Sequence, residues 1–184
     1  MILMSKTLVC VAHPNLERSR INKTWIAALE KHPECCSVHI IPNMDELTAE
    51  KIAEERKLIE QFDNVILQFP LYNFSCPVHG SFWIEKVFGW GWAFGLPDKP
   101  EQNHMRNIRF GAAVSAGCKG NEFTSEGYLG HTLEECLTHF KAFVNYGHSS
   151  WIGFHCLYGA EFGLAEEILT ANCEKYLDFL RSLK

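Results

Sequence analysis

The chain has 184 residues and a mass of 21.0 kDa, a size that suits one domain of ordinary length. Hydrophobic residues make up 47% and charged residues 21%, which is a globular composition and excludes a disordered chain. With 17 basic and 22 acidic residues the net charge is −5, which argues against nucleic acid as the main partner. We therefore expect residues 1–184 to form a single domain that binds no nucleic acid.

Short apolar runs alternate with amphipathic segments along the chain. The predicted strands, in order, are residues 6–12, 37–41, 64–69, 109–116 and 150–157. The predicted helices are residues 19–31, 48–61, 77–88, 131–146 and 164–184. This alternation is typical of a parallel sheet that carries helices on both faces. Five strands with five helices suit the doubly wound, flavodoxin-like α/β fold with strand order 2-1-3-4-5.

Aromatic residues are concentrated in one part of the chain, where nine fall between Phe69 and Phe94. This part overlaps the run from Asn64 to Ile84, which contains no Asp, Glu, Lys or Arg. The run is long enough for a membrane-spanning helix, which needs about 20 apolar residues. It is interrupted, however, by Gln68, Pro70, Asn73, Ser75, Pro77, His79 and Ser81. We therefore reject a transmembrane helix.

The eight cysteines form no Cys-x-x-Cys pair, and Cys10, Cys136 and Cys156 lie within apolar runs. This pattern is typical of reduced thiols in a cytosolic protein. Neither the cysteines nor the nine histidines have the spacing of zinc ligands, so no metal site is expected. The first six residues show no basic leader and no cleavage site, which favours a cytoplasmic location.

In an open sheet of this order, a ligand lies outside the carboxyl ends of the strands where the strand order reverses. The loop after the first strand leads into a helix, whose free backbone N–H groups and dipole favour a phosphate. Ser19 and Asn22 offer side-chain donors there, and Arg18, Arg20 or His13 offers charge. The alternative is that Ser19 only caps the helix and the arginines are solvated.

Two further loops lie at the same predicted edge. Residues 69–77 hold apolar and aromatic side chains between Pro70 and Pro77, which suits the wall of a flat heteroaromatic ligand. A packed corner of the core is the alternative. Residues 115–120 form a turn of small residues that would let the backbone approach a bound ring, or simply a tight turn.

Taken in order, these residues resemble the flavodoxin-like NAD(P)H:quinone oxidoreductases over nearly the whole chain. The likeness is greatest to the bacterial branch with the ancillary flavoproteins of glutathione-regulated potassium efflux systems. The motifs that carry it are His13-Pro14 with 19–23, Gln68 to Tyr72 with Ser75 and Pro77, 83–88, and 91–95.

The resemblance implies a bound FMN, or the FAD of longer relatives. Its phosphate would lie on His13, Ser19, Arg20, Ile21 and Asn22. Its isoalloxazine ring would pack on Pro70, Leu71, Tyr72, Asn73 and Phe74, and the turn of Ser115, Ala116, Gly117 and Cys118 would close its other edge. The resemblance further implies a homodimer that moves hydride from NAD(P)H through flavin N5 to a quinone-like acceptor, by two-electron ping-pong transfer.

The chain departs from the family pattern near the substrate pocket. Many relatives have Trp where Asn73 stands, and no Tyr–His pair can be carried over to Phe123 and Leu129. Tyr128 and His131 lie close by, so with Asn73 they are the candidate substrate-pocket residues. No side chain is assigned a catalytic role.

Two other functions remain open. The chain could be a flavin-binding regulatory subunit that binds a membrane transport protein and reaches the inner membrane only through that partner. A one-electron flavodoxin is the other alternative. For the leading function, a dimeric quinone oxidoreductase, we expect four further aromatic residues to cover the dimer interface and the substrate entrance, namely Trp83, Trp90, Trp92 and Phe94.

Overall fold

The computed structural model describes residues 6–183, and its five strands form one parallel sheet. The strand order is β2-β1-β3-β4-β5, which confirms the predicted flavodoxin-like topology. The strands are β1 (Thr7–Val11), β2 (Ser37–Ile40), β3 (Asn64–Pro70), β4 (Arg109–Ser115) and β5 (Ser150–Leu157). Every residue of β1 and β3 is buried, as expected for central strands covered on both faces.

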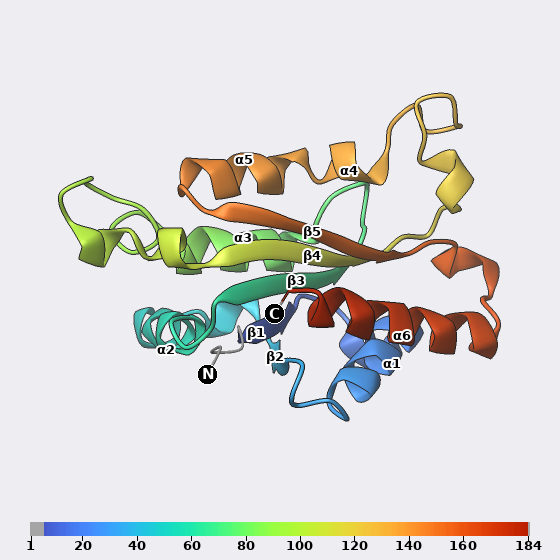
Figure 1. Ribbon diagram of the computed structural model, residues 1–184, viewed down its shortest axis with the longest axis horizontal. Helices are drawn as coiled ribbons and strands as arrows, with labels where there is room; N and C mark the ends of the chain where they lie inside the picture. The colour runs from blue at the N-terminus through green and yellow to red at the C-terminus, as the bar shows by residue number, and fades with distance from the viewer. Residues whose placement is uncertain (1–5, 184) are drawn as a thin grey trace.

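Helices lie on both faces of this sheet (Figure 1). They are α1 (Arg20–Leu29), α2 (Ala49–Ile59), α3 (Val78–Val87), α4 (Leu133–Cys136), α5 (Thr138–Tyr146) and α6 (Glu166–Arg181). Helices α1 and α6 pack together over one face, while α2, α3 and α5 contribute to the core on the other. No helix within residues 6–183 has the length and apolar character to cross a membrane.

The helix predicted over residues 131–146 is two helices instead of one. The break falls at Leu137, whose φ of −93° and ψ of 6° lie outside the α-helical range. Its side chain is fully buried, so packing favours this position in the core although the backbone leaves the helix. The sequence periodicity continues across such a break and therefore does not reveal it.

The aromatic residues after β3 are divided between the core and the surface. Trp83 is fully buried and Trp92 is 7% exposed, and their indole N–H groups donate to Glu55 and Glu60 at 2.9 Å each. The prediction that both residues cover a dimer interface is therefore wrong, because they pack within this chain. Trp90 is 64% exposed, but its loop follows α3 at the edge opposite the carboxyl ends of the strands (Figure 1). Trp90 is thus far from the carboxyl ends of the strands, where a ligand is expected.

A buried carboxylate joins β2, α2 and α3. Glu55 is 2% exposed, and its Oε2 lies 2.8 Å from His39 Nε2 and 2.9 Å from the indole nitrogen of Trp83. Burial alone would raise the pKa of Glu55, but the hydrogen bonds from His39 and Trp83 hold it below its usual value. The carboxylate is thus ionised and serves as a structural acceptor between the elements.

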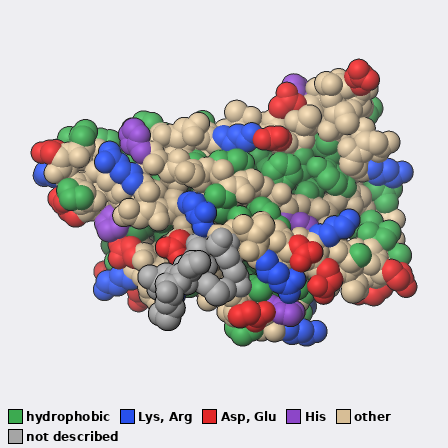
Figure 2. All heavy atoms as spheres, viewed as in Figure 1, with side chains coloured by type: hydrophobic (Ala, Val, Ile, Leu, Met, Phe, Trp, Pro, Cys, Tyr) green, Lys and Arg blue, Asp and Glu red, His purple; other side chains and the backbone are tan. Residues whose placement is uncertain are grey.

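The edge strand β5 is irregular. The β4–β5 register shifts between Phe110 and Ala112, and Gly153 has φ of +91°, which forms a bulge that favours glycine. A Cβ on Gly111 would lie 2.9 Å from the Gly153 carbonyl oxygen, so the two strands approach closely here. Hydrophobic side chains gather along this edge between α5 and α6 (Figure 2), where Trp151 and Phe154 are partly exposed.

Candidate functional site

A cavity of about 280 Å³ opens at the carboxyl ends of the strands. Its walls come from four loops, those after β1, β3, β4 and β5. The lining residues are His13, Arg18, Ser19, Arg20, Ile21, Asn22, Pro70, Ser115, Ala160 and Leu164. The structure therefore brings seven of the predicted cofactor-binding residues into one cavity: His13, Ser19, Arg20, Ile21, Asn22, Pro70 and Ser115.

The N-terminus of α1 forms one wall of this cavity. Ser19 caps the helix by accepting a hydrogen bond from the Asn22 backbone N–H at 3.2 Å. Within residues 6–183, the backbone N–H groups of Arg20 and Ile21 have no hydrogen-bond partner. The first turn contains no acidic residue. Free amides and the positive end of the helix dipole make this wall a favourable place for an anion.

Asn22 lies at the centre of a buried polar network. Its side chain is 1% exposed, and its Nδ2 donates to Ser19 Oγ at 3.3 Å and to Ser115 Oγ at 3.2 Å. Its Oδ1 accepts from Gln68 Nε2 at 3.2 Å. The network ties the loops after β1 and β4 to the end of β3. Sequence reasoning assigned no role to Gln68, although a polar residue inside the apolar run of β3 is a signal that could have identified it.

The two basic side chains expected to give charge at the cavity, Arg20 and His13, have other surroundings that affect their charge. Arg20 donates to the Leu164 carbonyl at 2.7 Å and pairs with Glu166 at 2.7 Å, so its charge is already engaged. Burial, together with the nearby His79, lowers the pKa of His13, so this ring is neutral at pH 7.

His13 nevertheless offers a donor. Its Nδ1 accepts from the Asn15 N–H at 3.0 Å, which leaves the ring proton on Nε2. Arg18 also lines the cavity and has no ion pair within the described part of the chain. Arg18 is therefore a cationic side chain at the cavity without an ion-pair partner among residues 6–183, whereas Arg20 has one.

The loop after β3 makes a tight turn. Tyr72 and Ser75 exchange two backbone hydrogen bonds at 3.0 Å, and the two residues between them have positive φ, 48° for Asn73 and 60° for Phe74. Two central residues of this kind define a type I′ turn, which Asn accepts readily and Phe does not. The turn holds the Phe74 ring 48% exposed. Strain at an exposed aromatic residue is a feature of functional sites.

Phe74 lines a second, mostly apolar cavity of about 380 Å³. The other lining residues are Leu129, His131, Glu135 and Cys136. His131 Nδ1 lies 3.8 Å from Glu135 Oε2 at the wall of this cavity. The candidate His131 is thus placed beside an apolar hollow, whereas Tyr128 is 91% exposed and lines neither cavity.

The other predicted residues lie nearby but outside the cavity walls. Leu71, Tyr72 and Asn73 follow Pro70 in the turn loop, and Ala116, Gly117 and Cys118 follow Ser115. A Cβ on Gly117 would lie 2.5 Å from Glu161 Oε1, so the segment after β5 packs directly over the small-residue turn. That segment also supplies Ala160 and Leu164, which sequence reasoning missed because it considered only three loops.

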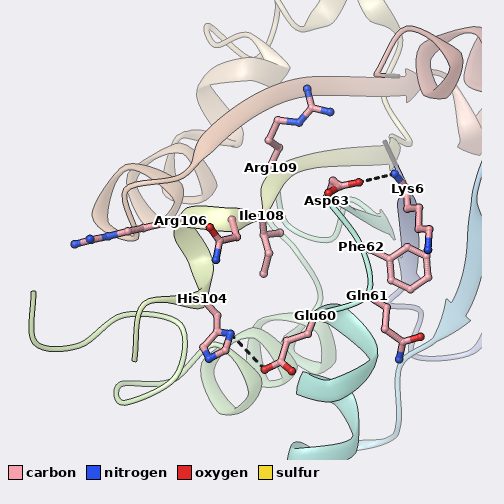
Figure 3. A pocket seen from close by; sticks show the side chains of 10 residues that line it. Lys6, Glu60, Gln61, Phe62, Asp63, His104, Arg106, Ile108 and Arg109 are labelled. Carbon is pink, nitrogen blue, oxygen red and sulfur yellow. Dashed lines mark hydrogen bonds and ion pairs between the residues drawn. The ribbon is translucent and has the colours of Figure 1, made fainter. Parts of the chain in front are cut away.

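A larger hollow of about 850 Å³ lies at the opposite edge of the sheet. Figure 3 shows its side chains: His104 pairs with Glu60 at 3.3 Å, while Arg106 and Arg109 point in different directions. Because its charged groups do not converge on one point, this hollow lacks the arrangement of a specific ligand site.

The fold is that of a known protein family. Residues 5–180 match the profile of a protein family described as having a flavodoxin-like fold. General stress protein 14 of Bacillus subtilis (strain 168) is 31% identical over 163 residues, which cover 89% of this chain and 90% of that protein. A more distant relative, the glutathione-regulated potassium-efflux system ancillary protein KefG of Yersinia pestis (strain Pestoides F), is 22% identical over 99% of this chain and 97% of its own.

Two solved structures share this architecture along nearly their whole length. General stress protein 14 from Treponema denticola, in complex with FMN, has a TM-score of 0.86 at 28% identity, covering 97% of this chain and 99% of its own. An NADPH-quinone reductase from P. pentosaceus has a TM-score of 0.83 at 26% identity, covering 95% and 97%.

Proposed function

The chain belongs to the flavodoxin-like family, and on that premise we propose that it is an FMN-dependent NAD(P)H:quinone oxidoreductase. The observation that carries the proposal is the cavity at the carboxyl ends of the strands, where the free amides of Arg20 and Ile21 meet the hydroxyls of Ser19 and Ser115. The FMN complex and the quinone reductase among the similar structures support the choice of cofactor and reaction.

The residues present fit the phosphate of FMN. The first turn of α1 carries no carboxylate, and the cavity walls offer four sets of donors: two free amides, His13 Nε2–H and the guanidinium of Arg18. A donor-rich, acid-free cradle at a helix N-terminus is suited to a phosphate dianion.

The type I′ turn and the second cavity would contact the isoalloxazine ring and a flat acceptor. We propose that residues 71–74 form the wall of the isoalloxazine site and that residues 116–118 close its other edge. When bound, FMN supplies hydride acceptance at N5 and two-electron transfer to an acceptor. Phe74 and Leu129 offer apolar contacts to a flat acceptor, and His131 stands at the cavity wall as a proton donor.

The test is to purify the chain, record its absorption spectrum, and reconstitute it with FMN and separately with FAD. The proposal expects bound FMN and NAD(P)H-dependent reduction of a soluble quinone, with the parallel double-reciprocal plots of a ping-pong reaction. A protein that binds neither flavin after reconstitution would refute the proposal. Light scattering on the flavin-bound protein tests the accompanying proposal of a homodimer, and a monomer at micromolar concentration would contradict it.

A second candidate is a regulatory subunit of a membrane transport protein, which the likeness to an ancillary protein suggests. The favouring observation is an exposed aromatic cluster far from the cavity, with Trp90 64% and Tyr146 61% exposed and Phe94 between them. This candidate would be favoured if the protein binds flavin but does not reduce quinones. It would be favoured further if the protein binds a transporter domain and Trp90→Ser abolishes that binding.

A further inference from the structure

A chain of directed hydrogen bonds runs from the interior of the sheet to the cavity. It begins at Gln68 in β3, whose side chain is fully buried, passes through Asn22 and ends at the hydroxyls of Ser19 and Ser115. Its interior members are thus shielded from water, so their donor and acceptor roles are decided by each other.

The direction of this chain follows from one contact. Gln68 Nε2 lies 3.4 Å from the backbone carbonyl oxygen of Asn22, and a carbonyl oxygen can only accept. The amide nitrogen of Gln68 must therefore face Asn22. The same nitrogen lies 3.2 Å from the Asn22 side chain, so the atom of Asn22 on that side is its oxygen. The Asn22 Nδ2 group is then turned toward the two serines.

This arrangement leaves one buried polar atom of Gln68 unsatisfied. Its Oε1 is buried and has no hydrogen-bond partner within residues 6–183. Reversing the Gln68 amide would bring this oxygen against the Asn22 carbonyl and leave the NH₂ group buried without an acceptor. A buried amide N–H without a partner is less tolerated than a carbonyl oxygen, so the observed orientation is the stable one.

The orientation decides where the serine protons go. Each serine Oγ accepts a hydrogen bond from Asn22, so each retains its own O–H for another partner, and both residues line the cavity. We propose that Gln68 is a positioning residue: by fixing the Asn22 amide, it keeps two hydroxyl donors directed at the phosphate of the bound flavin. This inference rests on the proposed FMN function.

In the opposite orientation of the Asn22 amide, the two serine hydroxyls would present acceptors to the cavity instead of donors. With Oδ1 toward the serines, both hydroxyls would donate to Asn22 and present lone pairs to the ligand. A phosphate dianion accepts hydrogen bonds and donates none, so this arrangement would repel it. Each lost donor to a charged ligand corresponds to a weakening of about tenfold or more.

The experiment compares two flavins that differ only in the phosphate. Dissociation constants of FMN and riboflavin are measured by flavin fluorescence quenching for the parent chain, Gln68→Leu and Gln68→Glu. We expect both variants to weaken FMN binding by about tenfold or more and riboflavin binding by less than about twofold. The matched control is Gln61→Leu, since Gln61 lies in the turn after α2 at the far edge of the sheet.

Two further variants test whether Gln68 acts on FMN binding through Asn22 and Ser115. If Gln68 acts through Asn22, Gln68→Leu should have no additional effect on FMN binding in an Asn22→Ala background. Ser115→Ala, which leaves Gln68 and the rest of β3 unchanged, should lower FMN affinity about tenfold and spare riboflavin.

Several outcomes would overturn the proposal. Unchanged FMN affinity in the Gln68 variants would do so, as would equal losses of FMN and riboflavin, which would indicate a merely structural role. Should the Gln68 variants not fold, as judged by circular dichroism, an FMN affinity that Ser115→Ala leaves unchanged would overturn the proposal, because the hydroxyl that Gln68 is proposed to direct would then serve no phosphate. A parent chain that binds neither flavin would instead refute the proposed function.

Discussion

Acidification should destabilise this fold through His155, a buried histidine of β5 that faces α1 and α6. The side chain is 7% exposed, its Nε2 lies 2.9 Å from Asn172 Oδ1, and its ring stacks on Tyr176 with centroids 4.7 Å apart. The same Asn172 oxygen accepts the indole N–H of Trp25 at 2.9 Å. Burial lowers the pKa of His155 from 6.5 to about 4, and its hydrogen bond to Asn172 opposes this shift only in part.

The sign of the effect follows from proton binding. Between pH 6.5 and about 4 the unfolded chain binds a proton at this position and the folded chain does not. Stability is therefore complete above pH 6.5 and is lost as the pH falls toward 4. Integrating the difference in proton binding gives a loss of about 2.5 kcal/mol between pH 8 and pH 4.5 from this one residue.

Urea unfolding at pH 8 and pH 4.5 measures this loss. His155→Gln removes the titrating group but keeps an amide that can donate to Asn172. Between pH 8 and pH 4.5, this variant should therefore lose about 2.5 kcal/mol less unfolding free energy than the parent. His148→Asn is the control, because it removes an exposed histidine and supplies a residue that tolerates the positive φ of 55°. Equal acid sensitivity of the parent and His155→Gln would refute the reasoning.

Three other substitutions have expected outcomes. Glu55→Ala leaves the buried indole N–H of Trp83 and the partly buried ring of His39 without their acceptor, and it should cost about 3 kcal/mol in urea unfolding. A loss below about 1 kcal/mol would be contrary to this account. Gly80→Ala places a Cβ 2.6 Å from Cys76 Sγ and 2.8 Å from Ala12 Cβ; it should lower stability by about 1–3 kcal/mol, and Cys76→Ala should restore part of it. Phe74→Gly should relieve about 1 kcal/mol of backbone strain and should raise KM for aromatic acceptors, because the exposed ring is lost. A lower thermal midpoint together with an unchanged KM would contradict this prediction.

The sequence was sufficient for the topology because short, mostly apolar strand segments alternate regularly with amphipathic helical segments along the chain. The rule that ligands lie at the carboxyl ends of such strands then located Ser19, Asn22, Pro70 and Ser115 correctly in one cavity. These predictions depend on local patterns and on one general rule about parallel sheets.

The rest of the site depends on contacts between residues far apart in the chain. The ion pair that engages Arg20 comes from Glu166, which no local pattern connects to it. Trp83 was expected at the surface although Val87, one turn later, is also buried and marks the inward face of α3. The direction of the Gln68–Asn22 hydrogen bonds likewise became visible only once both side chains were placed.

The bulge at Gly153 limits how the edge strand β5 can pair with a strand of another chain. A regular, partly apolar edge strand would invite another strand to pair with it and extend the sheet across two chains. Between Trp151 and Phe154, β5 contains one residue more than the facing part of β4, and this extra residue breaks the regular alternation of backbone groups along the free edge of β5. Association along β5 is thereby steered away from continuous sheets and fibrils, and toward contacts between side chains such as Trp151 and Phe154.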